Sequence, residues 1–316
     1  MGKQSGAIWL LLFLSTILVA TWIDLSGTML GRIILFDTHG TAAAESTPAA
    51  RLLVGGVLGA FVVLNFWSVR LLPFWWQVGV IWCELLILSG AFFDAFGLSY
   101  SFIAARLPIL VFIGAVTTIY ISLLSILCAS VLALAAALGR LSSSGPAYAV
   151  STFYISFFRG TPLLLQVYLI YLGLPQLGLT LDAVPSGIIA LSLCYGAYMA
   201  EIFRAGIQGV PRGQSEAAAA LGLHRGHIFR KIVFPQAMRL IVPPAGNQFI
   251  AMLKDSSLVS VMGVWELMFL ARTQGRSEFK HLEMLIAAAV IYWIISFAFE
   301  LAQARIERHF GKGIAR

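Results

Sequence analysis

Residues 107–138 read L-P-I-L-V-F-I-G-A-V-T-T-I-Y-I-S-L-L-S-I-L-C-A-S-V-L-A-L-A-A-A-L and contain no charged side chain. A helix that crosses a bilayer needs about 20 consecutive, mostly apolar residues, and this run is longer. A strand of a membrane β-barrel would show about ten residues of alternating hydrophobicity, and this run does not alternate. It therefore predicts a membrane-spanning helix that is tilted, kinked or extended into the interface.

Other runs along the chain have the same character, which predicts an all-α integral membrane protein of about eight transmembrane helices. The first run is interpreted as a retained anchor rather than a signal peptide. It is longer than a usual signal core, and no clear small-x-small cleavage site precedes Asp24. The candidate spans are Gly6–Ile23, Leu52–Val69, Leu71–Phe93, Leu107–Leu138, Ala147–Leu174, Ala183–Ala200, Ile241–Leu270 and Met284–Phe299.

The composition supports this class. Only 11% of the 316 residues are charged and 59% are hydrophobic, whereas a soluble domain carries roughly 25% charged residues. A soluble enzyme, a disordered chain and a fibrous protein are therefore excluded. The net charge of +7 does not indicate nucleic-acid binding, because no basic stripe carries interleaved aromatic residues. If both termini are cytoplasmic, most Lys and Arg residues lie on the cytoplasmic side of the membrane. The positive-inside rule favours this orientation.

No pattern in the chain predicts a metal site, a cofactor site or a catalytic site. The three cysteines lie inside apolar runs without C-x-x-C spacing, and the two neighbouring histidines lack a third ligand candidate. The sequence also contains neither G-x-S-x-G nor H-E-x-x-H. The residues concerned are Cys83, Cys128, Cys194, His224 and His227.

The largest polar segment between the apolar runs is residues 201–236, E-I-F-R-A-G-I-Q-G-V-P-R-G-Q-S-E-A-A-A-A-L-G-L-H-R-G-H-I-F-R-K-I-V-F-P-Q. Pro211 is expected to end the preceding helix, and Ser215 to cap a new one with Glu216 in its first turn. Gly222 is expected to end that short helix in a left-handed conformation. A helical pattern then resumes until Pro235 interrupts it.

The chemistry of this loop leaves two uses open. An exposed helix made of four alanines can lie in a groove of another protein. It can equally lie on the membrane surface, with Arg225, Arg230 and Lys231 near lipid headgroups.

The same loop resembles the signature loop of ABC-importer permeases, whose pattern is E-A-A, three residues, G, nine residues, I-x-L-P. Here Glu216-Ala217-Ala218, Gly222 and Pro235 match, and Phe234 stands where Leu is usual. Further stretches resemble the histidine, glutamine and arginine type of polar amino-acid permease, and the resemblance covers about residues 108–308. They are G-A-V-T-T at 114–118, F-R-G-T-P-L-L-L-Q at 158–166, Y-M-A-E-I-F-R-A-G-I-Q-G-V-P-R-G at 198–213 and K-D-S-S-L-V-S-V-M-G at 254–263.

The resemblance implies a five-helix type I permease core over residues 101–316, preceded by a three-helix membrane extension over residues 1–100. The loop at about 206–236 would hold the coupling helix, where Glu216, Ala217, Ala218, Gly222 and Pro235 would contact a separate ATP-hydrolysing subunit. This chain has no G-x-x-x-x-G-K-[ST] loop, so ATP is expected on that partner. A second permease subunit, identical or paralogous, and a periplasmic or lipid-anchored binding protein complete the complex in the bacterial inner membrane.

Polar residues inside spans are the other functional indication, because they are costly in lipid and usually face a cavity. Lys254 and Asp255 can line a translocation path or gate, or form a neutralising ion pair at a kink. Arg159-Gly160-Thr161-Pro162 predicts a helix break with Thr161 as cap and Pro162 at the first helical position, either a gate or a simple turn. The candidates for a path or gate are Arg159, Thr161, Asn247, Gln248, Lys254, Asp255, Ser256 and Ser257.

Four polar residues have other expected or alternative parts. Asn247 and Gln248 can alternatively bond across helices. Glu266 is expected near the outer interface and solvated, and Glu84 is expected to contact a neighbouring helix.

The sequence thus predicts a permease subunit that imports polar amino acids by alternating access and is not itself an enzyme. Alternatives are a permease for another small polar solute such as an opine, and an ion-coupled secondary transporter. The latter predicts inverted repeats, which the sequence does not show. A membrane-embedded enzyme would need clustered catalytic side chains, and a sensor or scaffold would differ in a transport assay.

Overall fold

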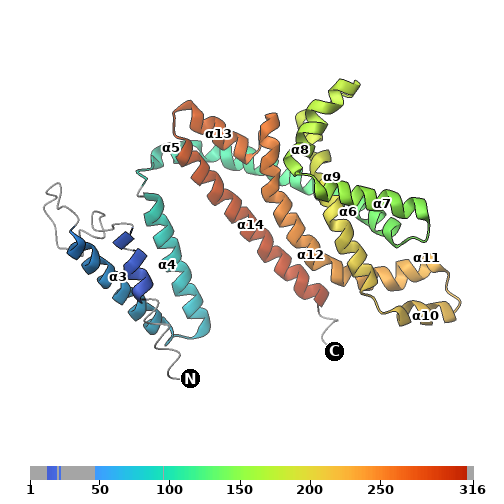
Figure 1. The fold of residues 1–316 in the computed structure, drawn as a ribbon, viewed down its shortest axis with the longest axis horizontal. Coiled ribbons are helices and arrows are strands. Elements are labelled where there is room, and N and C mark those ends of the chain that lie inside the picture. Colours follow the sequence, from blue (N-terminus) through green and yellow to red (C-terminus); the bar gives the residue numbers. More distant parts are fainter. Residues whose placement is uncertain (1–12, 20, 23–46, 95, 312–316) are drawn as a thin grey trace. The chain divides into compact units, whose positions relative to one another are not determined.

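A computed structural model of the chain describes residues 13–19, 21–22, 47–94 and 96–311, and all the regular structure in these ranges is helical (Figure 1). The chain divides into two compact units, Met1–Gly97 and Leu98–Arg316. The all-α class predicted from composition is therefore confirmed for the described ranges.

The first unit contains α3 (Pro48–Val69) and α4 (Phe74–Asp94). The Thr47 hydroxyl caps α3 by accepting a hydrogen bond from the Ala50 N–H at 3.3 Å. The Asn65 amide donates to a Glu84 carboxylate oxygen at 2.7 Å and so joins the two helices. The expectation that Glu84 contacts a neighbouring helix is thus confirmed. Half of the predicted span Gly6–Ile23 lies outside the described residues; its described positions, 13–19 and 21–22, are helical.

The second unit begins with one continuous helix of 42 residues, Tyr100–Leu141. A π-helical turn at Leu110–Ala115 divides it into α5 (Tyr100–Ile109) and α6 (Val116–Leu141). The remaining α-helices are α7 (Gly145–Gly160), α8 (Leu163–Tyr168), α9 (Ala183–Gln208), α10 (Arg212–Ala220), α11 (Arg225–Ile228), α12 (Phe234–Asp255), α13 (Leu267–Ser277) and α14 (His281–Gly311).

Four helices in the described residues are long and apolar enough to cross a membrane, and a bent pair makes a fifth candidate. The predicted count of about eight spans is therefore not reached within the described ranges. The four helices are Pro48–Val69, Tyr100–Leu141, Ala183–Gln208 and His281–Arg308, and the bent pair is Gly145–Gly160 with Leu163–Leu177.

Two predicted spans have a different form in the structure. The run Ala147–Leu174 is bent by 106° between α7 and α8, because Thr161 precedes Pro162 and therefore takes an extended conformation (φ −112°, ψ 143°). The prediction of a single span at Ile241–Leu270 is wrong. Helix α12 ends at Asp255, a 3₁₀ turn follows, and Gly263 (φ 79°) redirects the chain into α13.

Helix α9 forms the centre of the second unit and packs chiefly along α6. Fully buried alanines line the contact, which lets the two backbones approach closely, as is common in membrane bundles. A Cβ atom added to Gly196 would lie 2.5 Å from the Tyr154 hydroxyl of α7 and 3.1 Å from the Leu132 Cβ of α6, so glycine at this position lets α9 pack closely against both helices. The buried alanines include Ala129, Ala133, Ala197 and Ala200.

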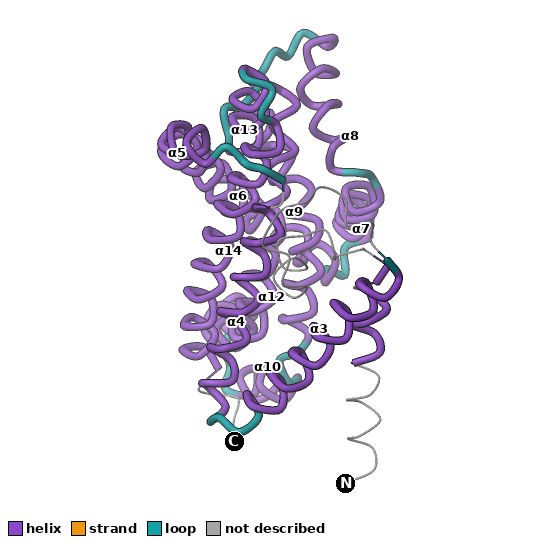
Figure 2. The backbone as a smooth tube through the Cα atoms, turned by 90° about the vertical axis from the view of Figure 1, so that its left-hand side faces the viewer, coloured by secondary structure: helices purple, strands orange, loops and turns teal. Residues whose placement is uncertain are grey.

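The second unit has two opposite ends along the direction of α14. Helix α13 and the start of α14 lie at one end, and α10 and α11 lie at the other (Figures 1 and 2). The loop singled out in the sequence is thus far from the α13 end of the core.

The prediction that Glu266 is solvated is wrong. Its side chain is fully buried, and its carboxylate caps α13 by accepting hydrogen bonds from the N–H groups of Met268 (2.9 Å) and Phe269 (2.6 Å). The Tyr292 hydroxyl donates a third at 2.8 Å. Burial raises the pKa of the Glu266 carboxyl to about 7, while these donors and the charge of Arg272 act in the opposite direction.

Candidate functional site

A cavity of about 420 Å³ lies where α7, α8, α9 and α12 meet. It collects polar side chains from segments about 40 to 100 residues apart in the sequence. Four of the predicted path or gate residues line it, namely Arg159, Thr161, Gln248 and Asp255. They share the wall with Gly160, Pro162, Leu163, Cys194, Tyr195 and Tyr198.

Asp255 supplies the negative charge of this cavity. It is the last residue of α12, and its carboxylate accepts a hydrogen bond from the Tyr195 hydroxyl of α9 at 2.7 Å. The alternative of a neutralising Lys254–Asp255 ion pair does not hold, since no such pair forms between these two described residues. One hydrogen bond orients the carboxylate and leaves further acceptor positions for a ligand.

Arg159 supplies the positive charge. It lies in the last turn of α7 and is exposed, and its guanidinium carbon lies 5.3 Å from the centre of the Tyr198 ring. This distance is typical of a cation–π contact. A cation–π contact uses the face of the guanidinium, so the N–H groups at its edge remain available to donate hydrogen bonds to a carboxylate.

The helix break that presents Arg159 is held by a buried amide. Gln166, which is 3% exposed, donates from its Nε2 atom to the carbonyls of Phe158 (2.9 Å) and Thr161 (3.1 Å) and to the Thr161 hydroxyl (2.9 Å). The predicted break is confirmed, but the predicted capping is wrong. Thr161 ends α7, and Pro162 precedes the first residue of α8 rather than occupying its first position.

Replacing Gln166 with leucine is expected to destabilise the fold by about 1–3 kcal/mol, because two carbonyls and a hydroxyl lose a buried donor. The apparent melting temperature of the purified chain in detergent should fall by about 5 °C. Gln176→Leu is the matched control, since this exposed amide makes a single 3.5 Å hydrogen bond. Equal melting temperatures for the two variants would contradict the proposed role of Gln166.

The other predicted path residues lie outside this cavity. Asn247 accepts a hydrogen bond from the Gln303 amide of α14 at 2.9 Å, so it bonds across helices. Lys254 is exposed, and Ser257 is half-buried. Ser256 is fully buried and donates to the Leu253 carbonyl at 2.7 Å, which closes the end of α12.

Two aromatic residues of the cavity were not singled out in the sequence. Tyr195 is 3% exposed and Tyr198 is 38% exposed, and they lie three positions apart on one side of α9. The sequence did show two tyrosines inside an apolar run, and a buried tyrosine hydroxyl usually has a hydrogen-bond partner. That pattern does not identify the partner, and Asp255 is 60 residues away.

The loop at the opposite end of the core forms a short helix with a defined end. In α10, Ala218 is 3% exposed and packs inward. Glu216, Ala217, Ala219 and Ala220 are exposed. Gly222 takes φ 77°, and the N–H of Leu223 donates to the Ala218 carbonyl at 3.2 Å. This is the Schellman arrangement, so the predicted left-handed end at Gly222 is confirmed.

Two details of that loop differ from the prediction. Helix α10 begins at Arg212 after Pro211, so Ser215 lies within the helix and does not cap it. Pro235 does not interrupt the following helix. It is the second residue of α12, directly after a π-helical turn at Phe229–Val233, and the helix continues through it.

Comparisons with known proteins agree with this arrangement. Residues 129–312 match the family described as "Binding-protein-dependent transport system inner membrane component". The chain is 43% identical over 205 residues to the L-cystine transport system permease protein TcyB of Bacillus subtilis (strain 168), covering 64% of this chain and 87% of that protein. It is 36% identical over 208 residues to the arginine transport system permease protein ArtQ of the same organism, covering 65% and 95%.

Solved structures are similar as well. A crystal structure of an amino acid ABC transporter with histidines matches with a TM-score of 0.63 and 36% identity, covering 67% of this chain and 99% of that chain. The inward-facing MetNI methionine ABC transporter matches with a TM-score of 0.54 at 20% identity, which shows the shared fold alone. The chain therefore belongs to the family of binding-protein-dependent transport system inner membrane components, the permease subunits of ABC importers.

Proposed function

We propose that this chain carries polar amino acids across the bacterial inner membrane as the permease subunit of an ATP-driven importer. The observation that carries the substrate class is the pair of opposite charges, Arg159 and Asp255, on the wall of one cavity. An α-amino acid is a zwitterion. Its carboxylate matches a guanidinium, and its ammonium group matches a carboxylate.

The size of the cavity supports the same class. A volume of about 420 Å³ falls within the usual range for small-molecule sites. Tyr195 and Gln248 add a hydroxyl and an amide, which can bond to a polar side chain of the substrate. Of the other candidates for the path or gate, the exposed Lys254 and the half-buried Ser257 lie at the same end of α12 as Asp255 and would extend the path. Asn247 and Ser256 would support it through their hydrogen bonds with Gln303 and Leu253.

The energy for transport would come from a separate ATP-hydrolysing subunit, because this chain has no phosphate-binding loop. We propose that this subunit contacts the exposed Glu216 and Ala217 of α10, while the buried Ala218 packs the helix against the core and Gly222 and Pro235 fix the ends of the loop. Glu216 borders two open cavities of about 460 and 350 Å³, which share Ser215 and Val233 as lining residues. The exposed Glu216 and Ala217 side chains beside these openings offer a partner a contact surface.

The working complex would also contain a second permease subunit, identical or paralogous, and a periplasmic or lipid-anchored binding protein. Closure of two ATPase subunits would move the coupling helices and switch the cavity between inward-facing and outward-facing states. Both termini would be cytoplasmic. Residues 1–100 would form a three-helix membrane extension of the permease core at 101–316.

The substrate class is tested in proteoliposomes that contain this chain with the ATPase subunit and binding protein from its own operon. Each of the twenty amino acids is screened for stimulation of ATP hydrolysis. We expect polar amino acids to stimulate hydrolysis several-fold and apolar ones to leave the basal rate unchanged.

Omission of the binding protein is the control, and it should abolish the stimulation. An assembled complex that responds to none of the twenty amino acids would contradict the amino-acid assignment. The substrate would then be sought among opines and other small polar solutes.

A further inference from the structure

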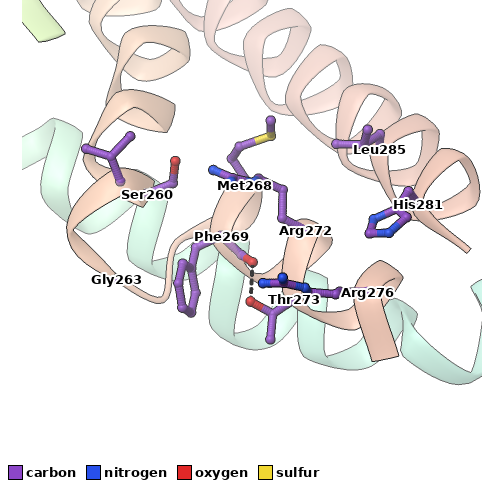
Figure 3. Close-up of a pocket in the computed structure, with 10 residues that line it drawn as sticks. Ser260, Gly263, Met268, Phe269, Arg272, Thr273, Arg276, His281 and Leu285 are labelled. Carbon is purple, nitrogen blue, oxygen red and sulfur yellow. Dashed lines mark hydrogen bonds between the residues drawn. The ribbon is translucent and has the colours of Figure 1, made fainter. Parts of the chain in front are cut away.

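A further cavity lies at the other end of the core from the coupling loop (Figure 1) and is not used by the proposed transport path. It measures about 1000 Å³ and opens between α13 and the start of α14 (Figure 3). Arg272 and Arg276 line it from successive turns of α13, and His281 lines it from the first residue of α14. Thr273 adds a hydroxyl.

The positive charges of this cavity have no acidic counterpart on its wall. Within the described residues no carboxylate lines the cavity, and no ion pair involves Arg272, Arg276 or His281. The charge of Arg272 does act on the buried Glu266 carboxylate, but that carboxylate is already bonded to two N–H groups and a hydroxyl. The nearby Glu278 pairs with Arg106 at 3.3 Å and lies 3.9 Å from Lys280. Two arginines four residues apart on one helix repel each other unless an anion lies between them.

Apolar side chains complete the wall. Val261 is one of the lining residues. Phe269 projects from α13, and Leu285 lies on α14 (Figure 3). A small hydrophilic anion would leave these side chains in water. The ligand that satisfies both parts of the wall is an amphiphile with a negatively charged head.

The position of the cavity is that of a membrane–water boundary. Helix α14 begins a candidate membrane span at His281, so the cavity lies where this span starts. Trp265 beside the cavity is 60% exposed, as is common in the aromatic belts of membrane proteins.

Phe279, between α13 and α14, strengthens this assignment. It is 89% exposed and holds φ 58°, a conformation that bulky residues rarely adopt. An exposed phenyl ring in a strained turn is unfavourable in water and favourable in the headgroup region of a bilayer. The turn thus presents an apolar anchor beside the cationic cavity.

We propose that the cavity between α13 and α14 binds the phosphate of an anionic phospholipid, with Arg272 and Arg276 as its phosphate ligands and Phe279 inserted beside the acyl chains. Guanidinium groups suit phosphate oxygens because they donate two parallel hydrogen bonds. A lipid held here would fix α13 relative to α14. This inference does not depend on which solute the importer carries.

The test is native mass spectrometry of the purified full chain with phosphatidylglycerol or phosphatidylcholine of identical acyl chains. The wild-type chain should retain at least one phosphatidylglycerol in preference to phosphatidylcholine. The double variant Arg272→Gln/Arg276→Gln should weaken that retention by about tenfold or more. Arg272→Lys/Arg276→Lys keeps the charge without the two-pronged geometry and should lose less.

The matched control is Arg305→Gln/Arg308→Gln, which removes two charges from the opposite end of α14 and should keep the preference. Circular dichroism of every variant confirms that it is folded. Unchanged retention in the Arg272/Arg276 variant, or an equal loss in the control, would overturn the proposal. Displacement of the lipid by glycerol 3-phosphate at equal concentration would identify a soluble phosphate as the ligand instead. Weaker binding-protein association with unchanged lipid retention would identify a protein docking site, and either result overturns the lipid assignment.

Discussion

Replacing Asp255 with alanine is expected to lower substrate uptake by about 10- to 100-fold while the complex still assembles. The carboxylate is the negative charge of the cavity formed by α7, α8, α9 and α12, and its one hydrogen-bond partner is the Tyr195 hydroxyl. A charge-assisted hydrogen bond to a ligand ammonium contributes about 1.5–3 kcal/mol, which corresponds to this range of rates. The fold should tolerate the change, because Asp255 is exposed and the Tyr195 hydroxyl that loses its acceptor lines the same open cavity, where water can take the place of the carboxylate.

Uptake of labelled substrate and the amount of co-purified ATPase subunit are measured on the same proteoliposomes. Asp182→Ala is the matched control, because this exposed aspartate precedes α9 outside the cavity and makes no capping hydrogen bond through its side chain. Tyr195→Phe separates the two roles of the pair, since it keeps the carboxylate and removes only the group that orients it. An Asp255→Ala complex with uptake equal to that of Asp182→Ala would show that the carboxylate is structural.

The second large effect is expected at the loop. Glu216→Lys should lower the fraction of ATPase subunit that co-purifies with this chain by about tenfold. Glu216 is exposed on α10 and borders both cavities next to this helix, so a partner that contacts the exposed face of α10 meets this charge. Reversal of a charge at a complementary interface costs several kcal/mol, whereas on an isolated helix the new repulsion with Arg212 costs only a few tenths.

The control for this change is Glu216→Gln, which removes the charge without reversing it and should retain most of the association. A second pair of variants tests the face of the helix. Ala217→Leu should disturb docking and leave the chain folded, while Ala218→Leu should lower the folded yield, because only Ala218 is buried. Wild-type co-purification of Glu216→Lys, together with normal transport, would remove α10 from the interface.

Much of this architecture could be read from local pattern. The long apolar runs predicted helices in a membrane, since a bilayer core accepts no unsatisfied backbone. The bend at Thr161-Pro162 and the left-handed Gly222 were predictable because each depends on the conformational preference of one or two residues. The same local reasoning was wrong at Ser215, where Pro211 starts the helix four residues earlier.

The composition of the cavity could not be obtained in that way. Arg159, Tyr195 and Asp255 meet because α7, α9 and α12 pack together, and the contact between α9 and α6 depends on small buried residues such as Ala197 and Gly196. A polar residue in an apolar run needs a partner, but the sequence does not name it. In the fold, the partner of Asp255 is the Tyr195 hydroxyl of α9 and not the adjacent Lys254.

Glu266 illustrates the same division. In the sequence it stands at the edge of an apolar run, where solvation satisfies a carboxylate. In the fold, the turn at Gly263 lets Glu266 cap α13 from a fully buried position. Local preferences act over a few residues and determine helices, bends and caps. The burial of a charge and the partner that accepts it depend on the packing of distant helices, which only the folded chain brings together.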